Sequence, residues 1–201
     1  MENFVITISR EFGSGGRKIG EEVAKKLGIN FFDKAIIDEA AVKSGLSPDF
    51  IEKEEQTFSN SILFNLATSG GQFGVGGTSL VDKIYISESK AIKEFAQQGS
   101  CVIVGRCADF IMRDKNSFNV FIYADDSFKH KRIVEEYGYP EKEASKLIKS
   151  RDKTRARHYN YYCDRLWGDR KNYHIMINSS AYGIDNTVDL IVESVKKHFC
   201  L

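Results

Sequence analysis

The chain has no excess of either charge and no long apolar run, and these two absences exclude broad classes of function. Its 201 residues include 29 Lys and Arg against 28 Asp and Glu, a formal net charge of +1. So small a charge gives no overall attraction to nucleic acid, and only local charge patterns could provide one. No stretch approaches the roughly 18 apolar residues of a membrane-spanning helix. No basic segment followed by an apolar one marks a signal peptide at the N-terminus.

Cysteine is also scarce. The four cysteines include no C-x-x-C pair, and they are Cys101, Cys107, Cys163 and Cys200. Zinc sites are usually built from closely spaced pairs, so no zinc site is predicted. Cys101 begins an apolar run and is expected to be buried. Without a secretion signal, we expect a reduced, cytoplasmic location. The hydrophobic content of 42% is that of a globular domain with a substantial core.

The N-terminal segment is the most informative part of the chain. An apolar run at residues 4–8 leads into a glycine-rich stretch at residues 13–16. A helical pattern follows at once over residues 15–27, and Gly28 is placed to end that helix. A strand, a glycine-rich turn and a helix N-terminus together make an anion site from backbone N–H groups. Phosphate is the usual occupant of such a site.

This loop departs from the phosphate-loop pattern G-x-x-x-x-G-K-[ST]. With Gly16 as the last glycine, Glu11 stands in place of the first glycine, and Arg17 and Lys18 replace the lysine and the hydroxyl residue. A planar guanidinium also binds phosphate, so Arg17 is a candidate, and Lys18 is a second one through a shifted loop. Two alternatives stay open: a tight turn that binds nothing, and a dinucleotide-binding loop, which residues 13–16 match only in its first half.

Apolar strands alternate with helical patterns along the chain. Strands are predicted at residues 4–8, 30–33, 101–104, 118–124 and 173–177, and helices at residues 15–27, 34–43, 48–55, 80–98, 127–137, 140–159 and 186–199. Several strands are apolar on both faces, which indicates a parallel sheet covered on both sides. Ligands of such sheets bind beyond the carboxyl ends of the strands. The segments at those ends are residues 11–17, Asp33, Gly105–Arg106 and Asp125–Asp126.

Residues 69–79 are rich in glycine and serine and are predicted to form a flexible connection. A second phosphate loop is the alternative, but no predicted strand precedes it. Ser79 is expected to cap the helix that follows, with Asp82 three residues later.

A basic stretch occupies residues 149–157, where every second residue is Lys or Arg. Helical spacing places Arg151 and Arg155 on one face, and Lys153 and Arg157 on another. Three interpretations stay open. The stretch is a solvated helix face, a phosphate clamp that closes over a bound nucleotide, or a nucleic-acid surface assisted by the tyrosines that follow. The third is the weakest, because no basic surface elsewhere is predicted.

Together, these motifs resemble the cytidylate kinase-like family, a branch of the P-loop nucleoside monophosphate kinases. The similar segments run in order along almost the whole chain: residues 6–17, 32–34, 102–106, 121–125, 151–162 and 177–180. The resemblance implies a three-layer α/β/α P-loop NTPase fold with a parallel sheet, in a single domain over residues 1–201. The core would comprise residues 1–33, 100–140 and 172–201, with a helical acceptor-binding insertion at 34–98 and an arginine-bearing lid at 141–171.

The resemblance also implies roles for individual residues. The donor phosphates would lie on Gly13, Ser14, Gly15, Gly16, Arg17 and Lys18. The acceptor would contact Asp33, Gly105 and Arg106. Catalysis would involve Arg17, Asp33 and the lid residues Arg151, Arg155 and Arg157. Two simpler interpretations stay open, because a strand-end Asp33 could merely cap the next helix and Arg106 could form a purely structural ion pair.

Three positions differ from the pattern of cytidylate kinases. Those enzymes have a lysine where this chain has Arg17, and acidic residues where it has Val104 and Cys107. CMP is therefore only one candidate acceptor, and another small hydroxyl or phosphate acceptor is the alternative.

We therefore expect an ATP-dependent phosphotransferase that acts on a nucleoside monophosphate, such as CMP, or on a related small acceptor. Mg²⁺ would arrive with ATP, held mainly by phosphates and water, so no protein metal ligand is predicted. The main alternative is a P-loop protein that binds a nucleotide or another anion without turnover. An RNA-associated protein that uses residues 149–162 is less favoured. No membrane partner is expected, and no oligomeric state is predicted.

Overall fold

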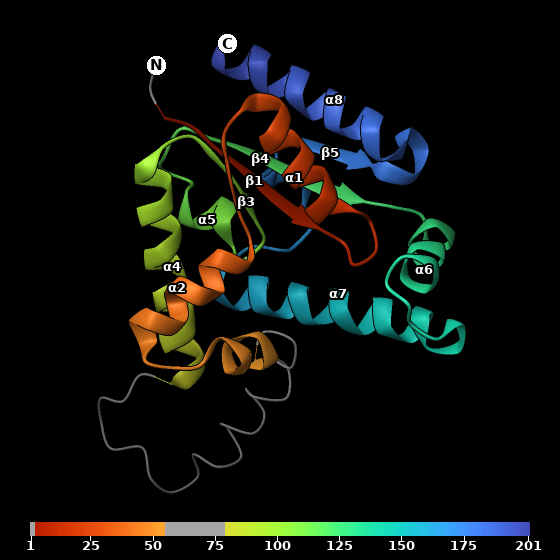
Figure 1. The fold of residues 1–201 in the computed structure, drawn as a ribbon, viewed down its shortest axis with the longest axis horizontal. Coiled ribbons are helices and arrows are strands. Elements are labelled where there is room, and N and C mark those ends of the chain that lie inside the picture. Colours follow the sequence, from red (N-terminus) through yellow and green to blue (C-terminus); the bar gives the residue numbers. More distant parts are fainter. Residues whose placement is uncertain (1–2, 55–78) are drawn as a thin grey trace, which may run out of the picture.

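Five strands form a parallel sheet at the centre of the molecule (Figure 1). The computed structural model describes residues 3–54 and 79–201. The strands lie in the order β2-β3-β1-β4-β5, and each paired neighbour runs parallel. Their bounds are β1 Val5–Arg10, β2 Asn30–Phe32, β3 Cys101–Val104, β4 Ser117–Tyr123 and β5 Ile175–Asn178.

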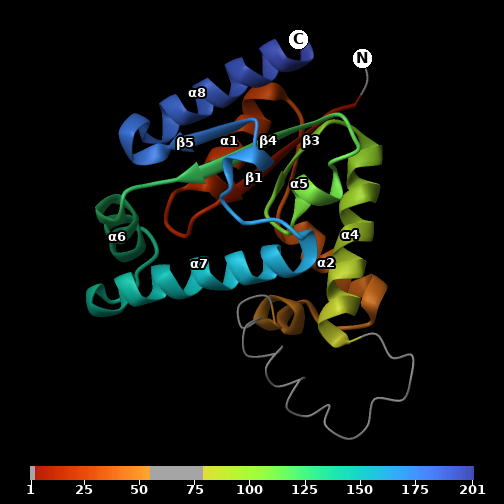
Figure 2. The same cartoon turned by 180° about the vertical axis from the view of Figure 1, so that it is seen from behind.

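Helices cover both faces of the sheet, as the two opposite views show (Figure 1, Figure 2). α1 and α8 lie side by side on one face, and α4 and α5 cover the other. α2 packs on α4, and α6 packs on the long helix α7. The bounds are α1 Gly16–Leu27, α2 Lys34–Ser44, α4 Leu80–Gln98, α5 Ala108–Ile111, α6 Asp126–Glu135, α7 Glu141–Cys163 and α8 Ser179–Phe199, with a 3-10 turn at Arg170–Asn172. None of the helices in the described residues is long and apolar enough to cross a membrane.

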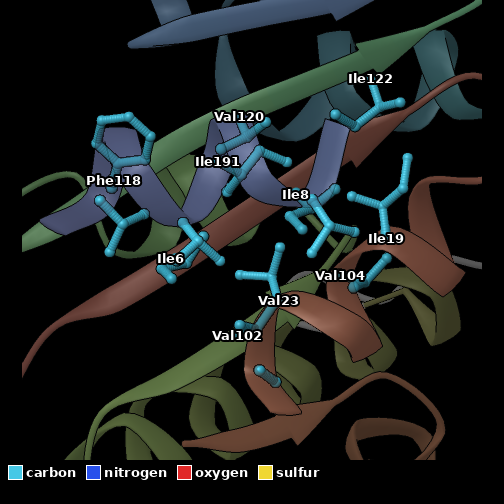
Figure 3. Close-up of a cluster of buried hydrophobic side chains, with 14 of the residues drawn as sticks. Ile6, Ile8, Ile19, Val23, Val102, Val104, Phe118, Val120, Ile122 and Ile191 are labelled. Atoms are coloured by element: carbon cyan, nitrogen blue, oxygen red, sulfur yellow. The ribbon is translucent and has the colours of Figure 1, made fainter. Parts of the chain in front are cut away.

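The two faces of the sheet form two apolar clusters. Successive side chains of a strand point to opposite faces, so Ile6 and Ile8 of β1 pack under α1 and α8 while Val5 packs under α4. Figure 3 shows the first cluster, in which Val23 of α1 and Ile191 of α8 meet the strands. Because both faces are covered, the inner strands are mostly apolar. This requirement explains why all four residues of β3 are apolar and buried.

The structure confirms the predicted α/β class and the order of strands and helices. Ser79 caps α4 as predicted, since its Oγ accepts a hydrogen bond from the Asp82 N–H at 3.2 Å. Gly28 ends α1 in the left-handed conformation with φ 65°. The prediction of a flexible connection at residues 69–79 falls, apart from Ser79, outside the described residues.

Several boundaries differ from the prediction. β1 continues to Arg10, β5 begins at Ile175, and α7 continues to Cys163. α8 begins at residue 179, not 186, because the Asn178 Oδ1 accepts the Ser180 N–H at 3.0 Å and caps an extra first turn before a kink at Gly183. α5 was not predicted, because a helix of four residues is too short to show an apolar period.

The strand register brings the predicted functional segments to one edge of the sheet. Ile8 of β1 pairs with Val104 of β3, and Phe32 of β2 pairs with Ile103. The residues that follow these strands therefore leave the sheet at nearly the same level. Asp33 and the loops after β1 and β3 thus become neighbours at the carboxyl edge, where parallel sheets bind ligands.

The central strand should be the most sensitive part of the core. Ile8 is 1% exposed, whereas Ile86 on α4 is 44% exposed. We expect Ile8→Ala to lower the free energy of unfolding by about 2–5 kcal/mol, because it removes buried methyl groups and leaves a cavity. The matched variant Ile86→Ala should change it by less than about 0.5 kcal/mol. Urea unfolding of both variants measures the difference, and equal effects would contradict this assignment of the core.

Candidate functional site

The glycine-rich loop between β1 and α1 is tightly packed against α6. Gly13 and Gly15 adopt left-handed backbone, with φ 87° and 82°. A Cβ on Gly13 would lie 3.1 Å from the Lys129 Cβ, and one on Gly15 would lie 3.0 Å from the Arg132 Nη1. Both glycines are therefore required by conformation and by close approach. α1 then begins at Gly16 with no acidic residue in its first turn, which leaves its positive N-terminal end available to an anion.

Two buried cations of α6 flank this loop. The Lys129 Nζ lies 2.9 Å from Oε2 of Glu11 and 2.9 Å from Oδ1 of Asp126. Burial would lower the pKa of Lys129, but these two hydrogen bonds outweigh it and raise the pKa above its usual value. The Arg132 Nη2 pairs with Glu136 at 2.7 Å, while its buried Nε has no hydrogen-bond partner among the described residues.

A pocket of about 360 Å³ opens beside the loop, between the carboxyl edge of the sheet, the start of α2 and one face of α7. Basic side chains dominate its wall, and aromatic side chains complete it. The charged lining residues are Arg10, Arg17, Asp33, Lys34, Glu52, Arg106, Arg151 and Arg155, and the aromatic ones are Phe12, Tyr139, His158, Tyr159 and Trp167. A wall of this kind suits an anionic ligand.

The carboxylate of Asp33 lies at the centre of the arginines. Its Oδ2 is 3.0 Å from the Arg17 Nε, and its Oδ1 is 3.0 Å from the Arg106 Nη1. Burial alone would raise the pKa of Asp33, but the charges of Arg106, Arg10 and Arg17 lower it below the usual value. Asp33 precedes α2 but makes no capping hydrogen bond with its side chain. The interpretation of Asp33 as a simple helix cap is therefore wrong.

Arg106 is held from two sides. Besides Asp33, it contacts Glu88 of α4, whose Oε1 lies 3.2 Å from the Arg106 Nε. Glu88 is fully buried. Arg106 and Cys107 adopt left-handed backbone, with φ 53° and 54°, an unusual conformation for residues other than glycine. Arg106 thus forms the ion pairs of the structural interpretation and also lines the pocket.

Helix α7 presents one face to the pocket and forms hydrogen bonds with the end of β1 and the loop that follows it. The Phe12 N–H donates to Oδ1 of Asp152 at 2.7 Å, and the Arg155 Nη1 donates to the carbonyl oxygen of Arg10 at 3.0 Å. Burial, followed by the nearby charge of Arg10, lowers the pKa of Arg155 to about 9, so it stays cationic at neutral pH. The predicted two faces are confirmed, since Arg151 and Arg155 line the pocket while Lys153 and Arg157 are exposed.

The structure brings most of the predicted site residues together. Six line the same pocket, namely Arg17, Asp33, Gly105, Arg106, Arg151 and Arg155. Gly13, Ser14, Gly15 and Gly16 form the adjacent loop. Lys18 and Arg157 are exposed and do not line the pocket, so their roles stay predictions.

Sequence reasoning did not single out five residues that lie in or beside the site. The rule that ligands bind beyond strand ends would have found Arg10, the last residue of β1. Glu88, Lys129, Arg132 and His158 lie within helices, where a polar residue gives no such signal. The His158 Nδ1 contacts Sγ of Cys107 at 3.6 Å at the pocket wall. No group of three or more His, Cys, Asp or Glu that could hold a metal occurs in residues 3–54 and 79–201.

Comparison with known proteins gives matches of two kinds. The sequence profile of the cytidylate kinase-like family matches residues 5–181. An uncharacterized protein from Eubacterium ventriosum has a similar structure, with a TM-score of 0.72 and 30% identity over 96% of this chain and 98% of that one. No curated protein is a significant match in sequence.

Two kinases share the fold at lower identity. Shikimate kinase from Bacteroides thetaiotaomicron has a TM-score of 0.56 and 16% identity, over 97% of this chain and 99% of that one. A gluconokinase from Sinorhizobium meliloti has a TM-score of 0.54 and 15% identity, over 97% of both chains. These likenesses establish a P-loop kinase fold for this chain.

The burial of the Asp152 carboxylate should make stability depend on pH. Burial, which outweighs the Phe12 N–H bond and Arg155, raises the pKa of Asp152 to about 6, against about 3.9 in an unfolded chain. The folded state then holds a proton that the unfolded state releases, so Asp152 lowers the free energy of unfolding as the pH rises from about 4 to 6. Asp152→Asn keeps an acceptor for Phe12 and removes the charge. Its stability relative to the parent should rise by about 2–3 kcal/mol across that window.

Urea unfolding at several pH values between 4 and 7 measures this difference. Asp38→Asn, which changes an exposed carboxylate on α2, is the matched control and should show no such trend. A difference between Asp152→Asn and the parent that is independent of pH would contradict the assignment.

Proposed function

The chain belongs to the cytidylate kinase-like family, and from that premise we propose that it transfers a phosphoryl group from ATP to a nucleoside monophosphate or a related small anionic acceptor. One observation carries the proposal. The pocket that holds the Asp33–Arg106 ion pair opens beside the glycine-rich loop, and Arg17 in the first turn of α1 lines that pocket and pairs with Asp33. A donor site and an acceptor site must adjoin in this way for phosphoryl transfer.

The donor site fits the phosphates of ATP. Gly13 and Gly15 direct the backbone of the loop around the start of α1, where N–H groups favour phosphate oxygens. The buried Nε of Arg132, which has no hydrogen-bond partner in the described part of the chain, lies in a side chain that packs against Gly15. A phosphate group on this loop would provide an acceptor for such a donor. Mg²⁺, when bound with ATP, would supply charge neutralisation and be held mainly by phosphates and water.

The acceptor site combines one negative charge with several positive ones. Because the pKa of Asp33 is lowered, the carboxylate is ionised at neutral pH. It is a weak base that orients an acceptor hydroxyl by accepting its hydrogen bond, rather than removing its proton early. Arg106, held by Asp33 and Glu88, would bind an anionic group on the acceptor. An acceptor that carries both a hydroxyl and a phosphate or carboxylate satisfies both features.

The reaction itself needs alignment and charge stabilisation. An oxygen of the acceptor bonds to the γ-phosphorus while the bond from that phosphorus to the β,γ-bridging oxygen breaks, and ADP leaves with the electron pair. When the acceptor oxygen is a hydroxyl, its proton passes to the Asp33 carboxylate late in the step, as the new bond is completed. Arginines that contact the equatorial oxygens stabilise this charge distribution. We propose that Arg17 and the pocket face of α7 provide these contacts, and that α7 acts as the lid over the donor.

A second candidate function is binding without turnover. It is favoured by the ion pair between Arg17 and Asp33, because Arg17 replaces the lysine of the phosphate-loop pattern and is engaged by a carboxylate. In that case the pocket would bind a nucleotide and transfer nothing.

The two candidates differ in an ADP-release assay. Mg²⁺–ATP is tested with a panel of nucleoside monophosphates, nucleosides, shikimate and gluconate. We expect turnover with one acceptor and at least a tenfold loss of kcat/KM in Arg17→Ala. No turnover with any acceptor, together with ATP binding that weakens in Arg17→Ala, would support the binding protein instead. A parent chain that binds no ATP would contradict both.

The lid proposal predicts different effects for two neighbouring basic residues of α7. Arg151 lines the pocket, whereas Lys153 is exposed outside it. Arg151→Ala should lower kcat by about 10²–10³, the usual cost of removing one donor to the transition state. Lys153→Ala should leave kcat and the melting temperature nearly unchanged. Steady-state kinetics measures both variants, and equal losses in the two would contradict a lid with one functional face.

A further inference from the structure

We propose that Arg10, the last residue of β1, is a catalytic residue that binds the γ-phosphoryl group where the donor loop meets the acceptor pocket. This inference rests on the proposed function and assigns to Arg10 the task that lysine performs in other phosphate loops. Neither the phosphate-loop pattern nor the sequence prediction gave Arg10 a role.

The path of the Arg10 side chain supports the proposal. A Cβ on Gly16, the first residue of α1, would lie 2.5 Å from the Arg10 Cβ and 2.9 Å from its Cγ. A Cβ on Gly105 would overlap the Arg10 Nη1 and lie 3.0 Å from the Cζ. The stem of Arg10 therefore crosses the start of α1, and its guanidinium lies over the turn that positions Arg106. The side chain thus extends from the donor loop to the acceptor loop.

The path of the Arg10 side chain explains why glycine is needed at positions 16 and 105. Gly16 has no positive φ, so its backbone conformation does not call for glycine. What excludes a side chain at Gly16 is the stem of Arg10. Gly105 has a φ of 79°, and its missing Cβ also leaves room for the guanidinium. One residue from each loop is thus kept small for the same arginine.

The surroundings fix the backbone of Arg10 and place its charge. β1 pairs Arg10 with Ile122 of β4, and the Arg10 carbonyl oxygen accepts from the Arg155 Nη1 at 3.0 Å. The charge of Arg10 contributes to the lowered pKa values of both Asp33 and Arg155. The Arg10 guanidinium is therefore near enough to Asp33 and to Arg155 of α7 to affect the protonation of both.

The cations around the loop differ in where their charges are placed. Lys129 is paired with Glu11 and Asp126, and Arg132 is paired with Glu136. The Arg17 side chain is 64% exposed and pairs with Asp33 on the acceptor side. Arg10 lines the pocket, and its side chain runs from the start of α1 to the turn at Gly105. A guanidinium there can bind two oxygens of the transferring group. Arg10 stays protonated throughout, while the γ-phosphorus exchanges its bond to the β,γ-bridging oxygen for one to the acceptor oxygen.

Nucleotide binding tests the contact without requiring turnover. Isothermal titration calorimetry gives the affinities of the parent and of Arg10→Ala for Mg²⁺–ATP and Mg²⁺–ADP. Loss of a charge-assisted contact to the γ-phosphate should lower the preference for ATP over ADP by about tenfold or more. An unchanged ATP-to-ADP ratio would overturn the role of Arg10, whether or not an acceptor is known. If Arg10→Ala shows this change but the parent phosphorylates no acceptor, the proposed transferase activity fails while the γ-phosphate contact of Arg10 stands.

Kinetics then tests the role in transfer. With an active acceptor, Arg10→Ala should lower kcat by about 10²–10³, and Arg10→Lys should restore part of it. A kcat of Arg10→Ala within about threefold of the parent would overturn the proposal.

Two glycine-to-alanine variants separate an effect on Arg10 from a general loss of stability. Gly105→Ala should displace the Arg10 guanidinium and reproduce the changed ATP-to-ADP preference. Gly28→Ala also places alanine at a positive φ, 65°, but apart from its chain neighbours no described residue lies within 4 Å of the new Cβ. Gly28→Ala should keep the preference of the parent while having a similar loss of melting temperature. An unchanged preference in Gly105→Ala would overturn the placement of Arg10 between the two loops.

Discussion

The carboxylate of Asp33 holds together positive side chains that would otherwise repel one another. Five arginines line a pocket of about 360 Å³, namely Arg10, Arg17, Arg106, Arg151 and Arg155. Arg17 and Arg106 each bind one oxygen of Asp33 at 3.0 Å. Because the charges of Arg106, Arg10 and Arg17 outweigh the cost of burial, the pKa of Asp33 is lowered and the carboxylate stays ionised. An anionic ligand that enters the pocket would share the arginines with Asp33.

The sheet makes this arrangement possible. Parallel pairing of β2, β3 and β1 brings Asp33, Gly105 and Arg10 to one edge from distant parts of the sequence. Glycines then allow the loops to approach each other closely, and left-handed backbone at Arg106 and Cys107 shapes the turn that presents Arg106. Strain of this kind is tolerated where the surrounding packing enforces it. The buried Glu88 and the ordered sheet provide that packing.

Much of the fold was predictable, and the site was predictable only in part. Apolar runs and glycines identified β1, its loop and α1, and the strand-end rule identified Asp33 and Arg106. Helical spacing separated Arg151 from Lys153, but tertiary packing alone decided which face meets the pocket. Glu88 was not predictable, because a single acid in a helix has the same sequence signal whether it is buried or solvated. Its contact with Arg106 supplies a carboxylate from α4. The residues that flank Gly105–Arg106 in the sequence, Val104 and Cys107, carry no carboxylate.

A crystal structure with Mg²⁺ and a non-hydrolysable ATP analogue tests most directly the claim that the glycine-rich loop and the Asp33 pocket form one phosphoryl-transfer site. The account predicts the triphosphate on the backbone of residues 13–16, with the γ-phosphate directed toward the pocket and contacted by Arg10. A triphosphate bound elsewhere, or one whose γ-phosphate points away from Asp33 and Arg10, would contradict the account.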